Sequence, residues 1–517
     1  MKTPVLFALD SGTSVVKAVA FDLGGQVIDS VARPNRPSHV AGGGVEQDMK
    51  RTWEDAVDVL AALRARVPQA TVAALAVTGQ GDGTWLMDAE GAPLAPAMLW
   101  LDGRAGELVA RVRETEAAAR VFAHTGSGLN ACQQSSQLLW LKTYRPELLA
   151  RAATVFHCKD WVYFNLTGVR GSDPSEACFT FGDWRHRNYD DEVLAALTLS
   201  EYRRLLPPII DGIHETHGLS VEAARRIGLP AGLPVVLGYV DVVCTALGGG
   251  IVGSRAGVST FGSTGMHLRL ATRNEDVRPS AAMTGYCMVF PAPGAVMQAQ
   301  TNMAATLNID WLIAIIREAA ALAGAGAEGD LLAALNRAAE TAKPGALLFH
   351  PFISNAGERG PFTDAKARAA ILGLDQRRGI GDLARAIFES LGFAARDCYE
   401  AMGGVPEEIL VTGGAAKSPL MRRILAAILD RPTRSLSQPE AGAAGAAMIA
   451  AVAIGAFPSI AACAAQWITP IIGPPTPPDV ALASVYRELF PIYQETYRAL
   501  QPSWQAMAAV REHNTDA

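Results

Sequence analysis

The chain has 517 residues, of which 50% are apolar and 19% charged, and its net charge is −6 at pH 7. This length and composition exclude a disordered protein and predict two packed domains. The acidic balance gives no support for nucleic-acid binding. Seven cysteines form no C-x-x-C pair, so we expect free thiols in a reducing cytoplasm, without disulfides or a zinc site. No signal peptide is expected, because the N-terminus leads directly into a short strand.

The first forty residues are typical of three successive strands. An apolar run ends in Asp10-Ser11-Gly12-Thr13-Ser14, and a second β-like run follows over 15–22. Small residues let the backbone approach phosphate oxygens, and Asp10 is placed to hold a magnesium ion. Asp, Ser and Gly are also common in ordinary hairpin turns, so this turn alone leaves both interpretations open.

Further along, β-like runs alternate with helical patterns. Thr52 is expected to cap a helix that carries Trp53, Val57 and Leu60 on one face. Strands are predicted at 71–78, 234–239, 257–261, 266–270 and 408–411, and helices at 241–247, 381–402 and 481–509. The strand–turn–strand pattern recurs near residue 260. We therefore predict two α/β halves that meet near residue 250.

The stretch 441–478 contains no charged residue, which raises the alternative of a membrane span. It is mostly alanine and glycine, which supply little transfer free energy, and prolines interrupt it. The composition favours a close-packed helix followed by a surface loop, and no membrane partner.

Standard nucleotide motifs do not explain this chain. A Walker A loop is absent, because Lys417-Ser418 follows alanine and not glycine. The G-x-G-x-x-G match at 248–253 follows a helical pattern and not a strand, so it is interpreted as accidental. Small-residue turns at 10–14, 262–265 and 413–415 each follow a β-run. Together they predict a nucleotide held in a cleft between the two halves.

This arrangement resembles the actin-like ATPase superfamily, and further motifs resemble the FGGY family of carbohydrate kinases over essentially the whole chain. The motifs are Val45-Glu46-Gln47-Asp48, Trp100-x-Asp102-x-Arg104, Gly238–Cys244, Gly357-Glu358-Arg359-Gly360-Pro361 and Val411–Ser418. The resemblance implies an α/β fold of two actin-like (ribonuclease H-like) ATPase domains with an active-site cleft between them. We expect domains at 1–250 and 251–480, with a helical extension at 481–517.

For Asp241, the resemblance implies the general base that takes the proton of the acceptor hydroxyl. Its place between a strand and a helix would aim its carboxylate into the cleft. The alternative is an ordinary helix N-cap, a common role for aspartate, and one residue can serve both purposes.

ATP and Mg²⁺ are the expected cofactors, with Asp10 as the metal ligand. Lys17 is a less certain phosphate contact, since it could equally be a solvated strand residue. The residues expected at the nucleotide are Asp10, Gly12, Thr13, Ser14, Lys17, Gly262, Ser263, Thr264, Gly413, Gly414, Ala415 and Ser418.

Vicinal hydroxyls of an acceptor are recognised by carboxylates and amides beside an aromatic wall. The candidates are Gln80, Gly81, Asp82, Trp100, Asp102, Arg104 and Asp241. Structural roles are the alternative: Asp102 and Arg104 could form a local ion pair, and Trp100 could belong to the core. Cys132 and Gly81-Asp82 depart from the residues of glycerol kinases, which makes glycerol doubtful as the substrate.

The segments 77–86 and 9–17 look most like the erythritol kinases of this family, which implies phosphorylation of a terminal hydroxyl of a small sugar alcohol. A ketopentose kinase of the xylulose type is the alternative within the family. An actin-like ATPase of the chaperone or filament type is the alternative of another class. A homo-oligomer is left open.

Overall fold

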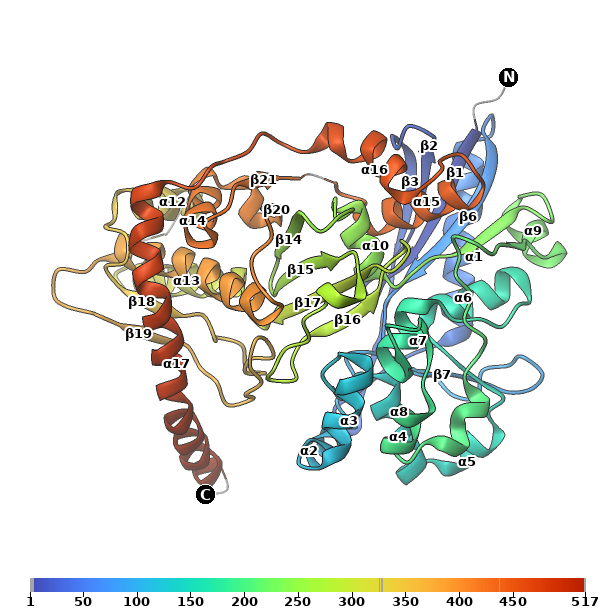
Figure 1. Ribbon diagram of the computed structural model, residues 1–517, viewed down its shortest axis with the longest axis horizontal. Helices are drawn as coiled ribbons and strands as arrows, with labels where there is room; N and C mark the ends of the chain where they lie inside the picture. Colours follow the sequence, from blue (N-terminus) through green and yellow to red (C-terminus); the bar gives the residue numbers. More distant parts are fainter. Residues whose placement is uncertain (1–3, 325, 327–328, 437, 516–517) are drawn as a thin grey trace.

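The computed structural model describes residues 4–515, apart from 325, 327, 328 and 437. The two halves of the chain form two lobes that lie side by side (Figure 1). A mixed sheet of six strands forms the centre of the first lobe, in the order β12-β13-β6-β1-β2-β3. Its strands are β1 (Pro4–Ser11), β2 (Val15–Asp22), β3 (Val27–Pro34), β6 (Thr71–Gly79), β12 (His217–Gly218) and β13 (Pro234–Leu237).

The second lobe repeats this plan in the order β16-β17-β15-β14-β20-β21. Its strands are β14 (Ala256–Phe261), β15 (Gly265–Ala271), β16 (Tyr286–Val289), β17 (Val296–Asn302), β20 (Glu408–Gly413) and β21 (Thr433–Ser435). In each lobe an antiparallel hairpin, β1–β2 or β14–β15, lies beside a parallel strand, β6 or β20. The predicted pair of α/β halves is therefore confirmed.

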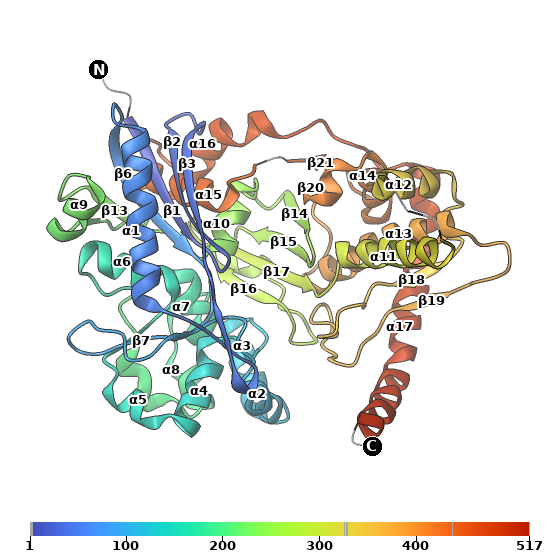
Figure 2. The same ribbon diagram turned by 180° about the vertical axis from the view of Figure 1, so that it is seen from behind.

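Helices cover both faces of the first sheet. Helix α1 packs on one face against β2 and β3, as Figure 2 shows, and α15 packs on the other against β1 and β6. The helices of the first lobe are α1 (Met49–Arg66), α2 (Gly106–Arg113), α3 (Glu116–Thr125), α4 (Gln134–Tyr144), α5 (Pro146–Arg151), α6 (Cys158–Thr167), α7 (Pro174–Phe181), α8 (Asp191–Ala196), α9 (Val221–Ile227) and α10 (Asp241–Gly248).

The helices that follow are α11 (Thr306–Leu322), α12 (Leu331–Thr341), α13 (Ile380–Ala401), α14 (Pro419–Leu429), α15 (Ala441–Ala453), α16 (Ile460–Trp467) and α17 (Val480–Thr515). Smaller sheets are formed by β4 (Ser38–Val40), β5 (Gly44–Gln47) and β8 (Ala97–Met98), by β7 (Trp85–Met87) and β9 (Thr154–Phe156), by β10 (Gly182–Asp183) and β11 (Asn188–Tyr189), and by β18 (Leu348–His350) and β19 (Ala370–Leu372).

The start of α1 differs from the prediction. Asp48 is its N-cap, and the Asp48 side chain accepts hydrogen bonds from the backbone N–H groups of Lys50 and Arg51. Thr52 lies one turn inside the helix, where its hydroxyl donates to the backbone carbonyl of Asp48 at 2.9 Å. Both residue types cap helices, and the aspartate comes first along the chain.

Helix α15 crosses from the second half of the chain to the first sheet. Its small residues permit close packing on α10: a Cβ on Gly445 would lie 2.0 Å from the carbonyl oxygen of Cys244, and one on Gly248 would lie 2.1 Å from that of Ala441. The prediction of a close-packed helix in the uncharged stretch is confirmed. No helix in the described part of the chain is both long and apolar enough to span a membrane.

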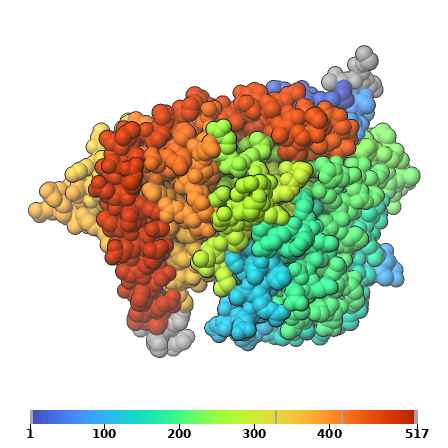
Figure 3. Space-filling model, viewed as in Figure 1, coloured from blue at the N-terminus to red at the C-terminus, as the bar shows by residue number. Residues whose placement is uncertain are grey.

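The long helix α17 runs along an outer edge of the second lobe, and Figure 3 shows it as a ridge beside a notch in the surface. Its buried face is aromatic, with Tyr486, Phe490, Tyr493, Tyr497 and Trp504 packed on the core beneath α13 and α14. The predicted terminal helix is therefore confirmed, and it extends past residue 509.

Candidate active site

The turn between β1 and β2 lies at the boundary of the two lobes. Asp10 is the next-to-last residue of β1 and pairs in register with Lys17 of β2. The start of α15 lies against its carboxylate, since a Cβ on Gly442 would be 2.8 Å from Asp10 Oδ2. Burial raises the pKa of Asp10 to about 6, while the Lys17 charge acts in the opposite direction and that of Glu440 adds to the rise. Lys17 Nζ pairs with Glu440 Oε2 at 2.9 Å.

Asp241 is the first residue of α10, on the same side of the first sheet as α15. The N-cap is Val240, which makes no capping hydrogen bond through its side chain, so the simple capping role does not account for Asp241. Burial is the main cause that raises the pKa of Asp241 to about 8, and the neighbouring charges of Asp10 and Glu176 add to it. Two carboxylates are thus held close to each other where the lobes meet.

The turn after β6 holds a third carboxylate. Asp82 adopts a left-handed backbone conformation, with φ of 54°, and its N–H donates to Glu176 Oε2 at 3.2 Å. Asp82 Oδ2 accepts a hydrogen bond from Cys132 Sγ at 3.3 Å. Asp82 Oδ1 is buried and has no hydrogen-bond partner among the described residues. Burial first, and then the Glu176 charge, raise the pKa of Asp82 to about 7.

Gly81 is tightly enclosed beside this carboxylate. A Cβ there would lie 2.5 Å from Val240 Cγ2 and 2.6 Å from Glu176 Oε1, so a larger residue would have to displace one of them. The turn that carries Asp82 therefore lies directly against the residue before Asp241.

A chain of hydrogen bonds connects the β1–β2 turn to the predicted acceptor residues. Thr13 Oγ1 donates to Gln80 Oε1 at 3.0 Å and accepts from Trp100 Nε1 at 2.7 Å. Gln80 in turn donates to Gln47 Oε1 at 2.9 Å. Trp100 is exposed, at 41%, and is not part of the core. Gln80 and Trp100 therefore hold the Thr13 hydroxyl in place, and their contact with an acceptor stays a prediction.

Asp102 and Arg104 form the local ion pair that the sequence left open. Arg104 Nη2 lies 2.6 Å from Asp102 Oδ2 and 2.9 Å from Glu46 Oε1. The buried Asp102 carboxylate also accepts from the N–H of Val45 at 2.9 Å, and the guanidinium stacks over Trp140. Both carboxylate oxygens of Asp102 are thus engaged within the protein. Direct binding of a ligand by this pair stays a prediction. The contacts of the pair favour a structural role, in which it connects β5 to the loop that carries Trp100.

The second lobe contributes the other two predicted turns. Gly262, Ser263 and Thr264 are exposed at the β14–β15 turn, and Gly413 ends β20 with φ of 77°. A Cβ on Gly413 would lie 2.4 Å from the Phe261 carbonyl oxygen, so this position requires glycine. Gly414 and Ala415 continue in a short 3₁₀ turn, and Ser418 is the N-cap of α14.

A cavity of about 960 Å³ lies where these turns face the first lobe. Its lining comes from both halves of the chain and includes Asp241, Thr245, Gly262, Thr264, Gly413, Gly414, Lys417 and Ala441. A cavity of about 110 Å³ opens beside Gly414 and Ser418 between α11, α13 and α14, with apolar walls. The structure thus brings Asp241 and the second-lobe turns together around one space, as the sequence predicted.

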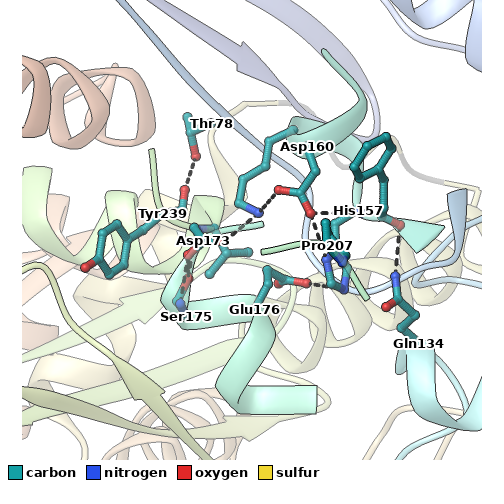
Figure 4. Close-up of polar contacts among 12 residues, drawn as sticks. Thr78, Gln134, His157, Asp160, Asp173, Ser175, Glu176, Pro207 and Tyr239 are labelled. Carbon is teal, nitrogen blue, oxygen red and sulfur yellow. Dashed lines mark hydrogen bonds and ion pairs between the residues drawn. The ribbon is translucent and has the colours of Figure 1, made fainter. Parts of the chain in front are cut away.

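Sequence reasoning missed a buried network of charges that includes His157, Asp160, Asp173 and Glu176 (Figure 4). Glu176 connects it to Asp82, whose N–H donates to Glu176 Oε2. Lys159 Nζ lies 2.8 Å from Asp160 Oδ1 and 2.5 Å from Asp173 Oδ2. His157 lies between Asp160 and Glu176, with its Nε2 2.9 Å from Glu176 Oε2. Burial opposes the charge on His157, but Glu176 and Asp160 outweigh it and raise its pKa to about 10. The available sequence signal was a Lys-Asp pair inside an otherwise apolar run, since long charged side chains are rarely buried unless paired.

The residues present suit a magnesium ion held mostly by phosphate and water. Among the described residues, no group of three or more His, Cys, Asp or Glu side chains is arranged to hold a metal. Mg²⁺ at phosphoryl-transfer sites commonly takes only one or two protein carboxylates, with substrate phosphates and water as its other ligands. Asp10 is a half-buried carboxylate of this kind, next to the β1–β2 turn.

Comparison with known proteins decides the family. The sequence profile of the N-terminal domain of the FGGY family of carbohydrate kinases matches residues 5–248, and that of its C-terminal domain matches 257–454. The chain belongs to the FGGY family of carbohydrate kinases. It is 48% identical to an erythritol kinase of Brucella abortus over 98% of both chains. It is 31% identical to a xylulose kinase of Escherichia coli over 86% of this chain and 89% of the other.

Solved FGGY kinases share the fold described above. A xylulose kinase from Rhodospirillum rubrum superposes with a TM-score of 0.87 at 27% identity, over 97% of this chain and all of the other. The family assignment makes the protein a kinase that uses ATP as phosphoryl donor. The chaperone and filament alternatives are not supported, because kinase-family profiles account for both lobes.

Proposed function

We propose that the protein phosphorylates erythritol at a terminal hydroxyl, with ATP as donor and Asp241 as general base. The choice of erythritol as substrate rests on the 48% identity to an erythritol kinase over 98% of both chains. The ketopentose alternative rests on a relative of 31% identity and has weaker support.

In this proposal Asp241 accepts the proton of the acceptor hydroxyl. The hydroxyl oxygen then forms a bond to the γ-phosphorus as the bond from that phosphorus to the bridging β–γ oxygen breaks, and ADP leaves. A carboxylate whose pKa is raised toward the working pH is a more effective base than one with an ordinary pKa. The raised pKa of Asp241, about 8, therefore suits this role.

Positioning and charge stabilisation account for most of the remaining catalysis in phosphoryl transfer. Asp10 would hold Mg²⁺, which supplies positive charge beside the phosphates when bound. Gly12, Thr13 and Ser14 would contact the phosphates from the first lobe, and Gly262, Ser263 and Thr264 from the second. Lys17 would exchange its contact with Glu440 for a phosphate oxygen.

The adenosine would lie on the second lobe. Gly413, Gly414 and Ala415 carry little or no side chain that would hold a flat ring away from the backbone. Ser418 and the apolar cavity between α11, α13 and α14 adjoin this surface, and they offer an aromatic base both a hydroxyl and an apolar enclosure.

An ADP-release assay across glycerol, erythritol, threitol, arabitol, ribitol, xylulose and ribulose tests the substrate. Erythritol is expected to give the highest kcat/KM. Turnover of a pentulose without turnover of erythritol would overturn the substrate and leave the kinase family intact.

A further inference from the structure

Arg359 lies on a loop of the second lobe that is held rigidly at several points. Glu358 Oε1 accepts hydrogen bonds from the N–H groups of Met303, at 2.8 Å, and of Arg359 itself, at 2.9 Å. The backbones of Glu358 and Asp364 exchange two hydrogen bonds. The Asn302 side chain donates to the carbonyl of Gly360 at 2.7 Å. These bonds fix the backbone on both sides of the arginine.

The two glycines of this loop allow it to lie close to its neighbours. Gly357 has φ of 75°, and a Cβ there would be 2.1 Å from the Asp364 carbonyl oxygen. A Cβ on Gly360 would be 2.5 Å from Gln300 Oε1. The result is a tightly anchored turn that presents one exposed arginine side chain. Within the described part of the chain, the guanidinium of Arg359 makes no hydrogen bond or ion pair.

The arginine faces the first lobe across the cleft. Arg359 lines a small cavity together with Arg113 and Asn130 of the first lobe and Tyr286 of the second. Asn130 and Cys132 lie two residues apart on the loop that contacts Asp82 through Cys132 Sγ. Arg359 is close enough to both Asp82 and Cys132 to stabilise their ionised forms. The second lobe therefore places a free cation near the buried carboxylate that holds an unpartnered oxygen.

Asp82 lies between Asp241 and the loop that faces Arg359. A Cβ on Gly81 would lie 2.5 Å from Val240 Cγ2, so the residue before Asp82 contacts the residue before Asp241. A linear polyol whose reacting hydroxyl lies at Asp241 would extend past Gly81 toward Asp82. Its far hydroxyl would reach the space between Asp82 and Arg359. A hydroxyl there can donate to the carboxylate and accept from the guanidinium at once, which satisfies both groups.

We propose that Arg359 is a specificity-determining residue of the acceptor site, supplied by the second lobe, which binds with Asp82 the hydroxyl farthest from the reacting carbon. The proposal rests on the polyol kinase function argued above. It explains why a rigid loop of the second lobe carries an exposed arginine toward the first-lobe loop that holds Asn130 and Cys132. It also couples acceptor length to closure of the lobes, since only an acceptor of sufficient length contacts both.

The test compares kcat/KM for erythritol with that for glycerol, which is one carbon shorter, in the full-length enzyme. Glycerol is followed as a substrate or, without turnover, through its inhibition constant against erythritol. Arg359→Ala is expected to lower the kcat/KM for erythritol, relative to that for glycerol, by about tenfold to 100-fold. The reason is that one hydrogen bond to a charged group is lost. The KM for ATP should change less than about twofold, on the same argument that the arginine contacts only the acceptor.

Asp82→Asn and the double variant identify the shared hydroxyl. If both side chains bind one group, the double variant should lose little more of the preference than the larger single effect. Arg377→Ala is the matched control, because Arg377 is an exposed arginine of the same lobe paired with Asp375. It should leave the preference unchanged.

Two results separate this proposal from the substrate assignment. If the wild type phosphorylates erythritol and Arg359→Ala keeps the wild-type preference within twofold, the role of Arg359 is overturned and the substrate stands. If the wild type uses another acceptor, the same ratio is measured for that acceptor and its one-carbon-shorter homologue. A lower ratio in Arg359→Ala would then support the role of Arg359, although the erythritol assignment would be wrong. An unchanged ratio would overturn both the role of Arg359 and the substrate assignment.

Discussion

Asp241 combines two features that a simple capping aspartate would not need. It follows the N-cap instead of occupying it, and burial, with the nearby charges of Asp10 and Glu176, raises its pKa to about 8. Asp241→Asn keeps the size of the side chain and removes the base. We expect kcat to fall about 10²- to 10⁴-fold, with little change in the KM for ATP. Steady-state kinetics measure this, with the exposed Asp191→Asn as control. More than a tenth of the wild-type kcat in Asp241→Asn would contradict the assignment.

Glu358 makes stability depend on pH through the loop that carries Arg359. It is buried, and burial raises its pKa to about 8, against 4.5 in the unfolded chain. The folded state therefore retains a proton that the unfolded state has lost between these values, so stability falls as pH rises from 4.5 to 8.

Glu358→Gln preserves an acceptor for both backbone N–H groups and cannot ionise. Relative to wild type, we expect it to gain stability between pH 5 and pH 8, on the order of a few kcal/mol. Denaturant unfolding of both proteins at the two pH values measures the difference. Parallel stability curves for the two proteins would show that Glu358 is already ionised in the native state.

At the level of elements, the sequence predicted the strands, helices and turns, which depend on the order of neighbouring residues. The turns at 10–14 and 262–265 were recognisable because each interrupts an apolar run with small polar residues. The paired role of Asp102 and Arg104 was foreseen only as an alternative, because their spacing fits both a pair and a ligand set. The network around Lys159 was not predicted. It joins α6 to α7 and to the loop before them, and no periodicity in the sequence encodes a contact between side chains on different helices.

That network supports the two helices next to the catalytic turn. Lys159 is fully buried, and its ammonium compensates the carboxylates of Asp160 and Asp173. Lys159→Met leaves Asp173 without its cation and Asp160 with His157 alone, and we expect a loss of about 3–5 kcal/mol in the free energy of unfolding. Lys50→Met, on the exposed face of α1, is the control and should change stability by about 0.5 kcal/mol or less. Urea denaturation tests both, and equal stabilities would show that the carboxylates are neutral in the native protein.

For the whole molecule, the two lobes are not independent units of packing. One continuous core includes residues of both central sheets, and α15 contributes much of it. The two family profiles divide the chain near residue 250. Yet α15, which comes from the second half, covers a face of β1 and β6. The chain therefore returns to the first lobe to complete it, beside the carboxylates of Asp10 and Asp241.

This crossing predicts that the first half cannot fold alone. Most residues of α15 are buried, and the helix packs on β1, β6 and α10. Removal of α15 would therefore expose the apolar faces of these three elements. A fragment of residues 4–253 should therefore show no cooperative thermal transition by circular dichroism. The same fragment joined by a short linker to residues 438–468 should regain one, because the end of α10 lies against the start of α15. Equal cooperative melting of both fragments would instead mean that the first sheet is stable without this helix, and that α15 serves only to join the lobes at the site.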